Sequence, residues 1–211
     1  MLKINFIGDS ITEGALATKT ENNFVSLLAK MSNSVVRNYG ISATRIAKNI
    51  KPSFDPSFDQ YFASRVDNMN HEADLVFVFG GTNDYGHGDA PLGKLGDKEP
   101  TTFYGAMDDL INKLLEYHKK EQIIFMLPIY RVNEDNPYGD GSKKVPGESL
   151  SRYREAMVEV LNIYQIKILD IKDEIGRAEN NPLIADGLHP NDAGHYKIAS
   201  LLNEYIRGLN I

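Results

Sequence analysis

The strongest constraint on the fold is an uninterrupted run of apolar residues, Leu75-Val76-Phe77-Val78-Phe79. A strand with one face in water alternates polar and apolar residues, whereas an unbroken apolar run is typical of a strand that is covered on both faces. Such strands occur mainly in parallel sheets, because their crossover connections place helices on both sides. Residues 75–79 are therefore expected to lie at the centre of an α/β fold.

Shorter apolar runs alternate with amphipathic segments along the rest of the chain. Phe24, Leu27, Leu28 and Met31 follow the i, i+3, i+4, i+7 spacing that places side chains on one face of a helix. The same patterns predict further strands at 2–7, 35–38, 122–127 and 166–170, and further helices around 60–67, 103–114, 150–164 and 198–206. This order of strands and helices predicts a doubly wound α/β sheet with helices on both faces.

Length and composition exclude several classes of protein. At about 150 residues per domain, 211 residues predict one domain spanning 1–211. The net charge is −6 and the basic residues are scattered, which disfavours a nucleic-acid partner. No apolar run approaches the ~18 residues of a membrane span. The N-terminus lacks the apolar stretch of a signal peptide, so a cytoplasmic location is expected.

Cysteine is absent from the sequence. This excludes disulfides, thiolate zinc sites and a cysteine nucleophile. His189 and His195 have no third ligand nearby in the sequence, so no metal is expected. Neither Gly-x-Gly-x-x-Gly nor Gly-x-x-x-x-Gly-Lys-Ser/Thr occurs, which disfavours a nucleotide-binding protein and agrees with the expectation of no cofactor.

Four small polar clusters are the candidates for chemistry: 8–12 (Gly-Asp-Ser-Ile-Thr), 38–40 (Asn-Tyr-Gly), 80–84 (Gly-Gly-Thr-Asn-Asp) and 186–190 (Asp-Gly-Leu-His-Pro). The first three follow predicted strands, and parallel strands bring their carboxyl ends to one edge of the sheet. Taken alone, each cluster has an ordinary interpretation as a helix cap or a turn. Together they supply a nucleophile, a base, an orienting carboxylate and oxyanion donors.

These four clusters resemble, in content and in order, the motifs of the SGNH hydrolases, also called the GDSL family of esterases and lipases. The resemblance extends from Phe6 to about Ala199, and Ile11 stands where the short name of the family has Leu. It implies a three-layer α/β/α sandwich, flavodoxin-like, with a five-stranded parallel sheet, and hydrolysis of ester bonds. The Gly-x-Ser-x-Gly elbow of the α/β-hydrolases is absent.

The residues and the resemblance lead to the same roles. Ser10 is expected to attack the acyl carbonyl, with His189 as its base and Asp186 as the partner of the imidazole. The Ser10 N–H, the Gly40 N–H and the Asn83 amide are expected to form the oxyanion hole. Asp192 also lies three residues from His189 and competes with Asp186, but its position at a helix start favours a capping role.

The long loops 85–100 and 133–147 follow predicted strands, and loops longer than 12–15 residues are often functional. Five side chains in or near them are candidate substrate contacts: Tyr85, His87, Tyr130, Arg131 and Tyr138. Asp9 and Asp84 are expected to hold neighbouring loops through hydrogen bonds. His71, His118 and His195 are expected to face solvent or to lie at helix ends.

The leading hypothesis is a serine esterase for a small-molecule ester, with a small acyl group or an acetylated carbohydrate as substrate. One rival is a lysophospholipase or thioesterase that accepts longer acyl chains. Another is a non-catalytic binding module that keeps the same fold. The sequence does not determine the oligomeric state.

Overall fold

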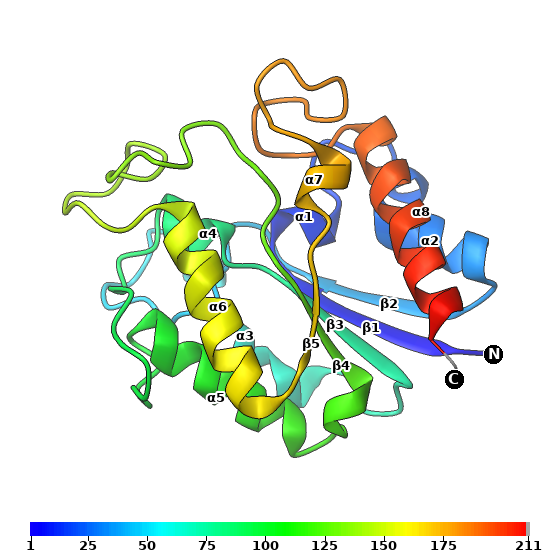
Figure 1. Cartoon of the computed structure of the whole chain (residues 1–211), viewed down its shortest axis with the longest axis horizontal. Coiled ribbons are helices and arrows are strands. Elements are labelled where there is room, and N and C mark those ends of the chain that lie inside the picture. The colour runs from blue at the N-terminus through cyan, green and yellow to red at the C-terminus, as the bar shows by residue number, and fades with distance from the viewer. Residues whose placement is uncertain (210–211) are drawn as a thin grey trace.

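The fold is built around a parallel sheet of five strands in the order β2-β1-β3-β4-β5 (Figure 1). The computed structural model of the chain describes residues 1–209. This strand order is the flavodoxin-like one, so the predicted topology is confirmed. The strands are β1 (Lys3–Gly8), β2 (Val35–Gly40), β3 (Leu75–Phe79), β4 (Ile123–Met126) and β5 (Lys167–Leu169).

Helices cover both faces of the sheet and give three layers (Figure 1). On one face Val76 and Val78 of β3 pack against α3 (Phe62–Arg65), α5 (Phe103–Leu115) and α6 (Leu150–Tyr164). On the other face Leu75, Phe77 and Phe79 pack against α2 (Phe24–Ser32), α7 (Lys172–Ile175) and α8 (Asp192–Gly208). Every residue of β3 is buried, as the unbroken apolar run predicts.

The helix and strand boundaries predicted from the sequence agree best with the structure where the apolar pattern is unbroken or spans several helical turns. The segments 75–79 and 150–164 coincide with β3 and α6. The helix predicted around 60–67 is shorter, because α3 ends at Arg65 and the chain continues as the 3₁₀ turn Val66–Asn68. The helices α1 (Ser10–Glu13) and α4 (Thr82–Gly86), like α7, are single turns that are too short to produce a helical period in the sequence.

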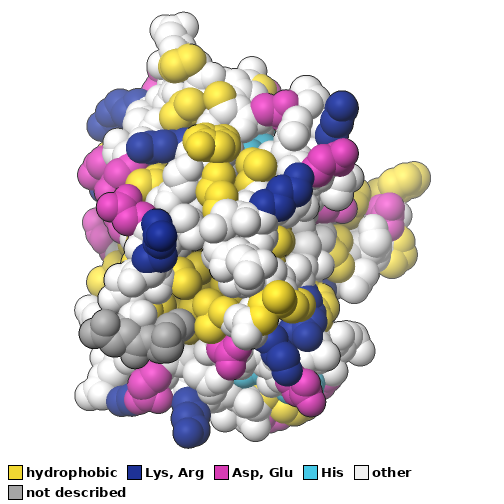
Figure 2. Space-filling view, turned by 90° about the vertical axis from the view of Figure 1, so that its right-hand side faces the viewer, with side chains coloured by type: hydrophobic (Ala, Val, Ile, Leu, Met, Phe, Trp, Pro, Cys, Tyr) yellow, Lys and Arg dark blue, Asp and Glu magenta, His cyan; other side chains and the backbone are white. Residues whose placement is uncertain are grey.

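The face formed by α2 and α8 carries basic and acidic side chains in alternation, with apolar side chains between them (Figure 2). Figure 2 thus shows no single-sign patch on this face. Among residues 1–209, no helix combines the length and the apolar character needed to cross a bilayer.

Candidate active site

Ser10 lies at the carboxyl end of β1, on the first residue of α1. The Asp9 side chain caps α1 by accepting the Ile11 N–H at 3.0 Å. A Cβ at Gly8 would overlap Thr12 and the Phe79 carbonyl, so glycine allows the strand to meet α1 and β3 closely. The Ser10 N–H is the first amide of the helix and therefore has no acceptor within it. This arrangement leaves both the hydroxyl and the amide of Ser10 at the edge of the sheet.

The loop before α8 brings His189 to Ser10. The Ser10 Oγ and the His189 Nε2 are 2.9 Å apart, and the His189 Nδ1 is 2.7 Å from an Asp186 carboxylate oxygen. The β-bridge between Ile184 and Pro190 closes this loop, and its Gly187 carbonyl accepts the Val132 N–H at 2.8 Å. Residues that are 179 positions apart in the sequence thus form a continuous hydrogen-bonded chain.

Asp186 is oriented by the backbone of its own loop. Its Oδ1 accepts the N–H groups of Leu188 and His189, which leaves Oδ2 for the imidazole. Burial raises the pKa of Asp186, but the hydrogen bonds from His189 and Leu188 outweigh burial and bring the pKa below its ordinary value. Asp186 is therefore ionised at neutral pH.

Asp192, the competing candidate, lies elsewhere. Its carboxylate accepts hydrogen bonds from the Thr18 N–H, the Thr18 hydroxyl and the Asn22 amide. These bonds hold the segment before α2 against the first turn of α8. The His189 ring is bonded to Asp186 instead, so the geometry favours Asp186 over Asp192.

The expected oxyanion donors Gly40 and Asn83 come from the carboxyl ends of the two strands that pair with β1. Gly40 is the register partner of Gly8, and a Cβ at Gly40 would overlap the backbone of Thr12 and Glu13. Asn83 is buried in the first turn of α4, and its amide donates to the Thr44 carbonyl at 3.0 Å. One hydrogen of that amide remains for a ligand, since an amide NH₂ has two.

The Gly40 N–H already has an acceptor. It donates to the Asn38 side-chain oxygen at 2.8 Å, and the Asn38 amide donates to the Thr12 carbonyl at 2.7 Å. An oxyanion must share the Gly40 N–H with Asn38 or displace Asn38. This contact was not predicted from the sequence, although an Asn two residues before a Gly is the pattern of an Asx turn.

Two buried carboxyl groups lie beneath the site. Burial raises the pKa of Asp9 to about 7, against the hydrogen bond from Ile11, and the charge of Asp84 raises it further. Burial also raises the pKa of Asp84, which accepts the Ile46 and Ala47 N–H groups at 3.0 and 2.8 Å. Asp84 thus holds a neighbouring loop, as expected, whereas the side chain of Asp9 caps its own helix α1.

Two of the candidate substrate contacts, Tyr85 and Arg131, lie against each other in the interior. Tyr85 is buried in the core, and its hydroxyl donates to the carbonyls of Asn133 and Asn136. Arg131 is buried against the Tyr85 ring and donates to the Thr82 carbonyl at 3.1 Å. Both side chains hold the loop after β4 to α4, and their contact with a substrate stays a prediction.

The remaining three candidates are more accessible. The Tyr130 hydroxyl donates to Asp173 of α7 at 2.9 Å. Tyr138 is half exposed. His87 follows α4 directly, with its Nε2 3.3 Å from the Ala43 carbonyl and its Nδ1 3.5 Å from Asp140.

Two other histidines were expected to face solvent or to lie at helix ends. His195 lies in the first turn of α8 and His118 just after the end of α5, and both side chains are buried. The His195 ring lies between the Ala15 carbonyl and the Phe24 N–H, at 3.1 and 3.3 Å, and joins α8 to the chain around α1 and α2. Within residues 1–209, no group of three or more His, Asp or Glu side chains is arranged to hold a metal ion.

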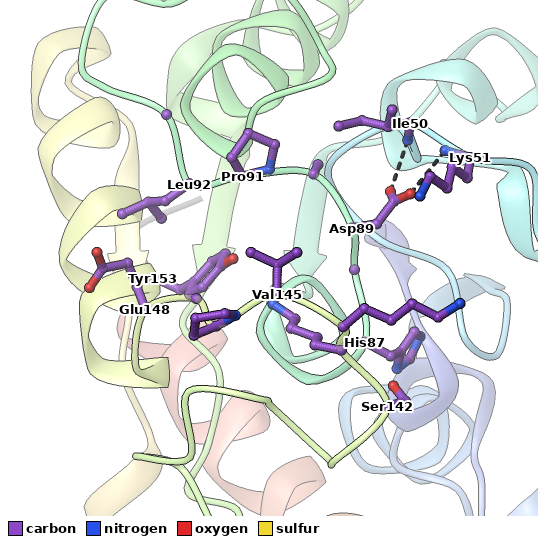
Figure 3. Close-up of a pocket in the computed structure, with 17 residues that line it drawn as sticks. Ile50, Lys51, His87, Asp89, Pro91, Leu92, Ser142, Val145, Glu148 and Tyr153 are labelled. Atoms are coloured by element: carbon purple, nitrogen blue, oxygen red, sulfur yellow. Dashed lines mark hydrogen bonds between the residues drawn. The ribbon is translucent and has the colours of Figure 1, made fainter.

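Two neighbouring cavities lie between the long loops. The loop cavity, of about 690 Å³, is lined by residues 50–51, 87–93 and 142–148 and by Tyr153 (Figure 3). The entry cavity, of about 510 Å³, is lined by residues between 43 and 58, by His87 and Asp89, and by Asp140 and Ser142. Neither lining includes Ser10, Asp186 or His189. Tyr153 of the loop cavity was not predicted from the sequence, because its place in the apolar stripe of α6 is that of a core residue.

Comparisons with known proteins agree with this architecture. The model of the GDSL-like lipase/acylhydrolase family matches residues 6–197. A solved structure from Lactobacillus plantarum is 29% identical, covers 100% of this chain and 98% of its own, and superposes with a TM-score of 0.81. No curated protein sequence is significantly similar to the chain.

Two more distant structures share the fold. An aryl esterase from M. smegmatis is 17% identical, with coverage of 99% of this chain and 100% of its own and a TM-score of 0.72. Est24, a carbohydrate acetylesterase from Sinorhizobium meliloti, is 14% identical, and the match covers 98% of this chain and 99% of Est24 with a TM-score of 0.69.

Proposed function

The chain belongs to the GDSL-like lipase/acylhydrolase family and hydrolyses ester bonds, and we propose that it does so as a serine esterase through a covalent acyl-enzyme on Ser10. The observation that carries this proposal is the hydrogen-bonded series from Ser10 Oγ to His189 at 2.9 Å and from His189 to Asp186 at 2.7 Å. A hydroxyl is a weak nucleophile at neutral pH, and an imidazole within hydrogen-bond distance removes this limitation.

In the first step, the Ser10 oxygen attacks the carbonyl carbon and its proton passes to the His189 Nε2. Asp186 accepts the Nδ1–H of His189 and stabilises the imidazolium ion that forms. The negative charge on the former carbonyl oxygen is bound by the Ser10 N–H and the free hydrogen of the Asn83 amide. The Gly40 N–H joins them when it is shared with Asn38.

In the second step, the tetrahedral intermediate expels the alcohol, whose oxygen takes the proton from His189 Nε2. Ser10 is then acylated. His189 next removes a proton from a water molecule that attacks the acyl carbon, and the carboxylic acid leaves as Ser10 regains its proton. Each step uses only groups on the edge formed by β1, β2, β3 and the loop before α8.

The leading substrate is an ester with a small acyl group, including an acetylated carbohydrate. The activities of two proteins with the same fold, the aryl esterase and the carbohydrate acetylesterase, are compatible with such substrates. A hydrolase for larger acyl groups, such as a lysophospholipase or thioesterase, is the second candidate. The loop cavity of about 690 Å³ favours it, because that volume greatly exceeds the need of an acetyl group.

The test is a panel of p-nitrophenyl esters from acetyl to palmitoyl, beside acetylated sugars, with the Ser10→Ala protein as the control. We expect hydrolysis by the wild-type protein that Ser10→Ala abolishes, together with fluorophosphonate labelling of Ser10. No hydrolysis of any ester by the wild-type protein overturns the proposal and favours the binding module. Labelling that persists in Ser10→Ala identifies another serine as the nucleophile.

A further inference from the structure

The loop cavity is enclosed by the two long loops that follow β3 and β4. The loop after β4 is fastened to α4 by the Asp140 N–H, which donates to the Gly86 carbonyl at 2.9 Å, and by the Lys143 ammonium, which donates to the Asp84 carbonyl at 3.0 Å. On the other side, the Asp89 carboxylate accepts the N–H groups of Ile50 and Lys51 at 2.8 and 2.9 Å (Figure 3). These bonds tie three separate segments into one walled space.

The loop cavity lies close to the oxyanion donors. His87 lines both cavities and follows Asn83 by four residues, which is about one helical turn, or ~6 Å along α4. Ala43 lines the entry cavity, and the next residue, Thr44, holds the Asn83 amide through its carbonyl. The entry cavity thus adjoins the loop cavity and begins one residue from Thr44, the partner of Asn83.

The loop cavity contains a polar group that has no hydrogen-bond partner within the described part of the chain, residues 1–209. Tyr153 of α6 is only 2% exposed, yet its hydroxyl makes no hydrogen bond with any residue in 1–209. Figure 3 shows the Tyr153 hydroxyl directed toward Val145, away from α6. The ring of Tyr153 is buried, but its hydroxyl oxygen opens into the cavity and is free to donate to a ligand. This hydroxyl is a donor at neutral pH, since burial raises the pKa of Tyr153 above its ordinary value.

The rest of the lining selects against a strongly charged ligand. Apolar contacts come from Ile50, Pro91, Leu92 and Val145 (Figure 3). Lys143 lies over the Tyr153 ring at 5.4 Å, and Lys51 and Lys144 also line the space, but Asp89 and Glu148 oppose their charge. An uncharged chain with one hydrogen-bond acceptor fits this combination of apolar walls, a hydroxyl donor and nearly balanced charges.

The position of His189 indicates which end of the ester reaches the loop cavity. His189 protonates the leaving oxygen, so the alcohol departs on the side of His189. Neither cavity is lined by any residue of the loop that carries Asp186 and His189. The group that extends past Asn83 and Ala43 is therefore the acyl group.

We propose that the loop cavity is a subsite for an uncharged, medium-length acyl chain that carries a hydrogen-bond acceptor, such as a ketone, for the Tyr153 hydroxyl. This inference rests on the proposed function and refines its substrate class. It assigns Tyr153 as a specificity-determining residue.

The experiment uses p-nitrophenyl oxoalkanoates in which a ketone is placed at successive positions from the fifth carbon outward, each paired with the plain alkanoate of the same length. For at least one position we expect the oxo ester to be preferred in kcat/KM by about tenfold, the upper range of one neutral hydrogen bond. In Tyr153→Phe, which removes only the hydroxyl, that preference falls to about one. Tyr196→Phe, at an exposed position of α8, is the matched control and retains the preference.

A second variant tests the cavity itself. Val145 is 71% exposed and lines the loop cavity, so Val145→Trp can narrow the cavity with little risk to folding. We expect the kcat/KM ratio of octanoyl to acetyl p-nitrophenyl esters to fall about tenfold in Val145→Trp. The ratio of octyl acetate to ethyl acetate should change by less than about twofold. A larger effect of the alcohol chain than of the acyl chain overturns the assignment to the acyl side.

A binding measurement separates failure of this inference from failure of the proposed function. Calorimetric titration of Ser10→Ala with the preferred oxo ester needs no turnover, and adding Tyr153→Phe should weaken binding about tenfold. The subsite proposal fails if the wild-type protein prefers no oxo ester over the plain alkanoate ester of the same length. It also fails if no oxo ester binds Ser10→Ala more tightly than that alkanoate ester. Both results would count against the subsite even where acetyl esters are hydrolysed. If the ester binds with this preference but is not hydrolysed by the wild-type protein, the subsite stands and the esterase proposal fails.

Discussion

The two halves of the active site are held in opposite ways. Ser10 and Asn83 lie on the edge of the sheet, only 7% and 4% exposed, and are fixed by strands that pair along their whole length. Asp186 and His189 lie on the loop before α8, with side chains 45% and 19% exposed, and are fixed by a few local hydrogen bonds. The buried edge thus depends on folding of the whole sheet, whereas the loop is a local structure that is added to it.

The largest effect is expected from removal of the nucleophile. Ser10→Ala should lower kcat by a factor on the order of 10⁵–10⁶, because no other group can form the acyl-enzyme. Ester hydrolysis measures this loss, and thermal unfolding should remain close to that of the wild-type protein. A residual activity of a few per cent or more would exclude Ser10 from the covalent step.

The next largest effect is expected on the loop. Asp186→Asn should lower kcat roughly 10²- to 10⁴-fold, since the imidazole loses its orientation and the imidazolium its partner. Because Asp186 is half exposed, the free energy of unfolding at neutral pH should change much less than for substitutions at the buried edge. Asp192→Asn serves as the matched control and should retain activity within about tenfold. The reverse ranking of the two variants would reassign the orienting carboxylate.

On the buried edge, Asn83→Ala should lower kcat by a factor on the order of 10²–10³, the usual loss for one oxyanion donor. It should also lower stability, because the Asn83 amide holds the Thr44 carbonyl. Parallel measurements of kcat and of the urea midpoint test both parts. A loss of activity below about tenfold would remove Asn83 from the oxyanion hole.

The last prediction concerns the pH dependence of stability and leaves catalysis aside. The pKa of Asp9 is about 7 in the folded state, against 3.8 for a solvated aspartate side chain, so the folded protein binds more protons between these values. The free energy of unfolding must therefore decrease as pH rises from about 4 to 7, by at most ~4 kcal/mol for a shift of this size. Asp9→Asn, which keeps a good capping residue, should remove that decrease.

Urea unfolding of the wild-type protein and Asp9→Asn at pH 5 and pH 8 measures the difference in slope. Asp55→Asn, at an exposed turn, is the control and should unfold with the wild-type slope. Asp186 acts with the opposite sign, because its lowered pKa gives stability that is present above about pH 4 and is lost as the pH falls further. An identical slope in wild-type and Asp9→Asn would show that Asp9 is already ionised in the folded protein.

Much of this architecture was predictable because its signals are local. The unbroken run 75–79 predicts a strand buried on both faces, and the structure places Val76 and Val78 in one core and Phe77 in the other. The stripe at 150–164 predicts α6 because fifteen residues show a full helical period. The single turns α1, α4 and α7 escaped prediction since each is shorter than one repeat of the pattern.

The sequence by itself determined the order of the strands and helices and the residue types available for ester hydrolysis, because periodicity and motifs are properties of neighbouring residues. Only the tertiary structure decided that Asn38 occupies the Gly40 N–H, that Tyr85 and Arg131 are buried, and that the Tyr153 hydroxyl faces a cavity. Burial and hydrogen bonding of these groups depend on segments far apart in the chain, which are neighbours only once the sheet and its loops have assembled.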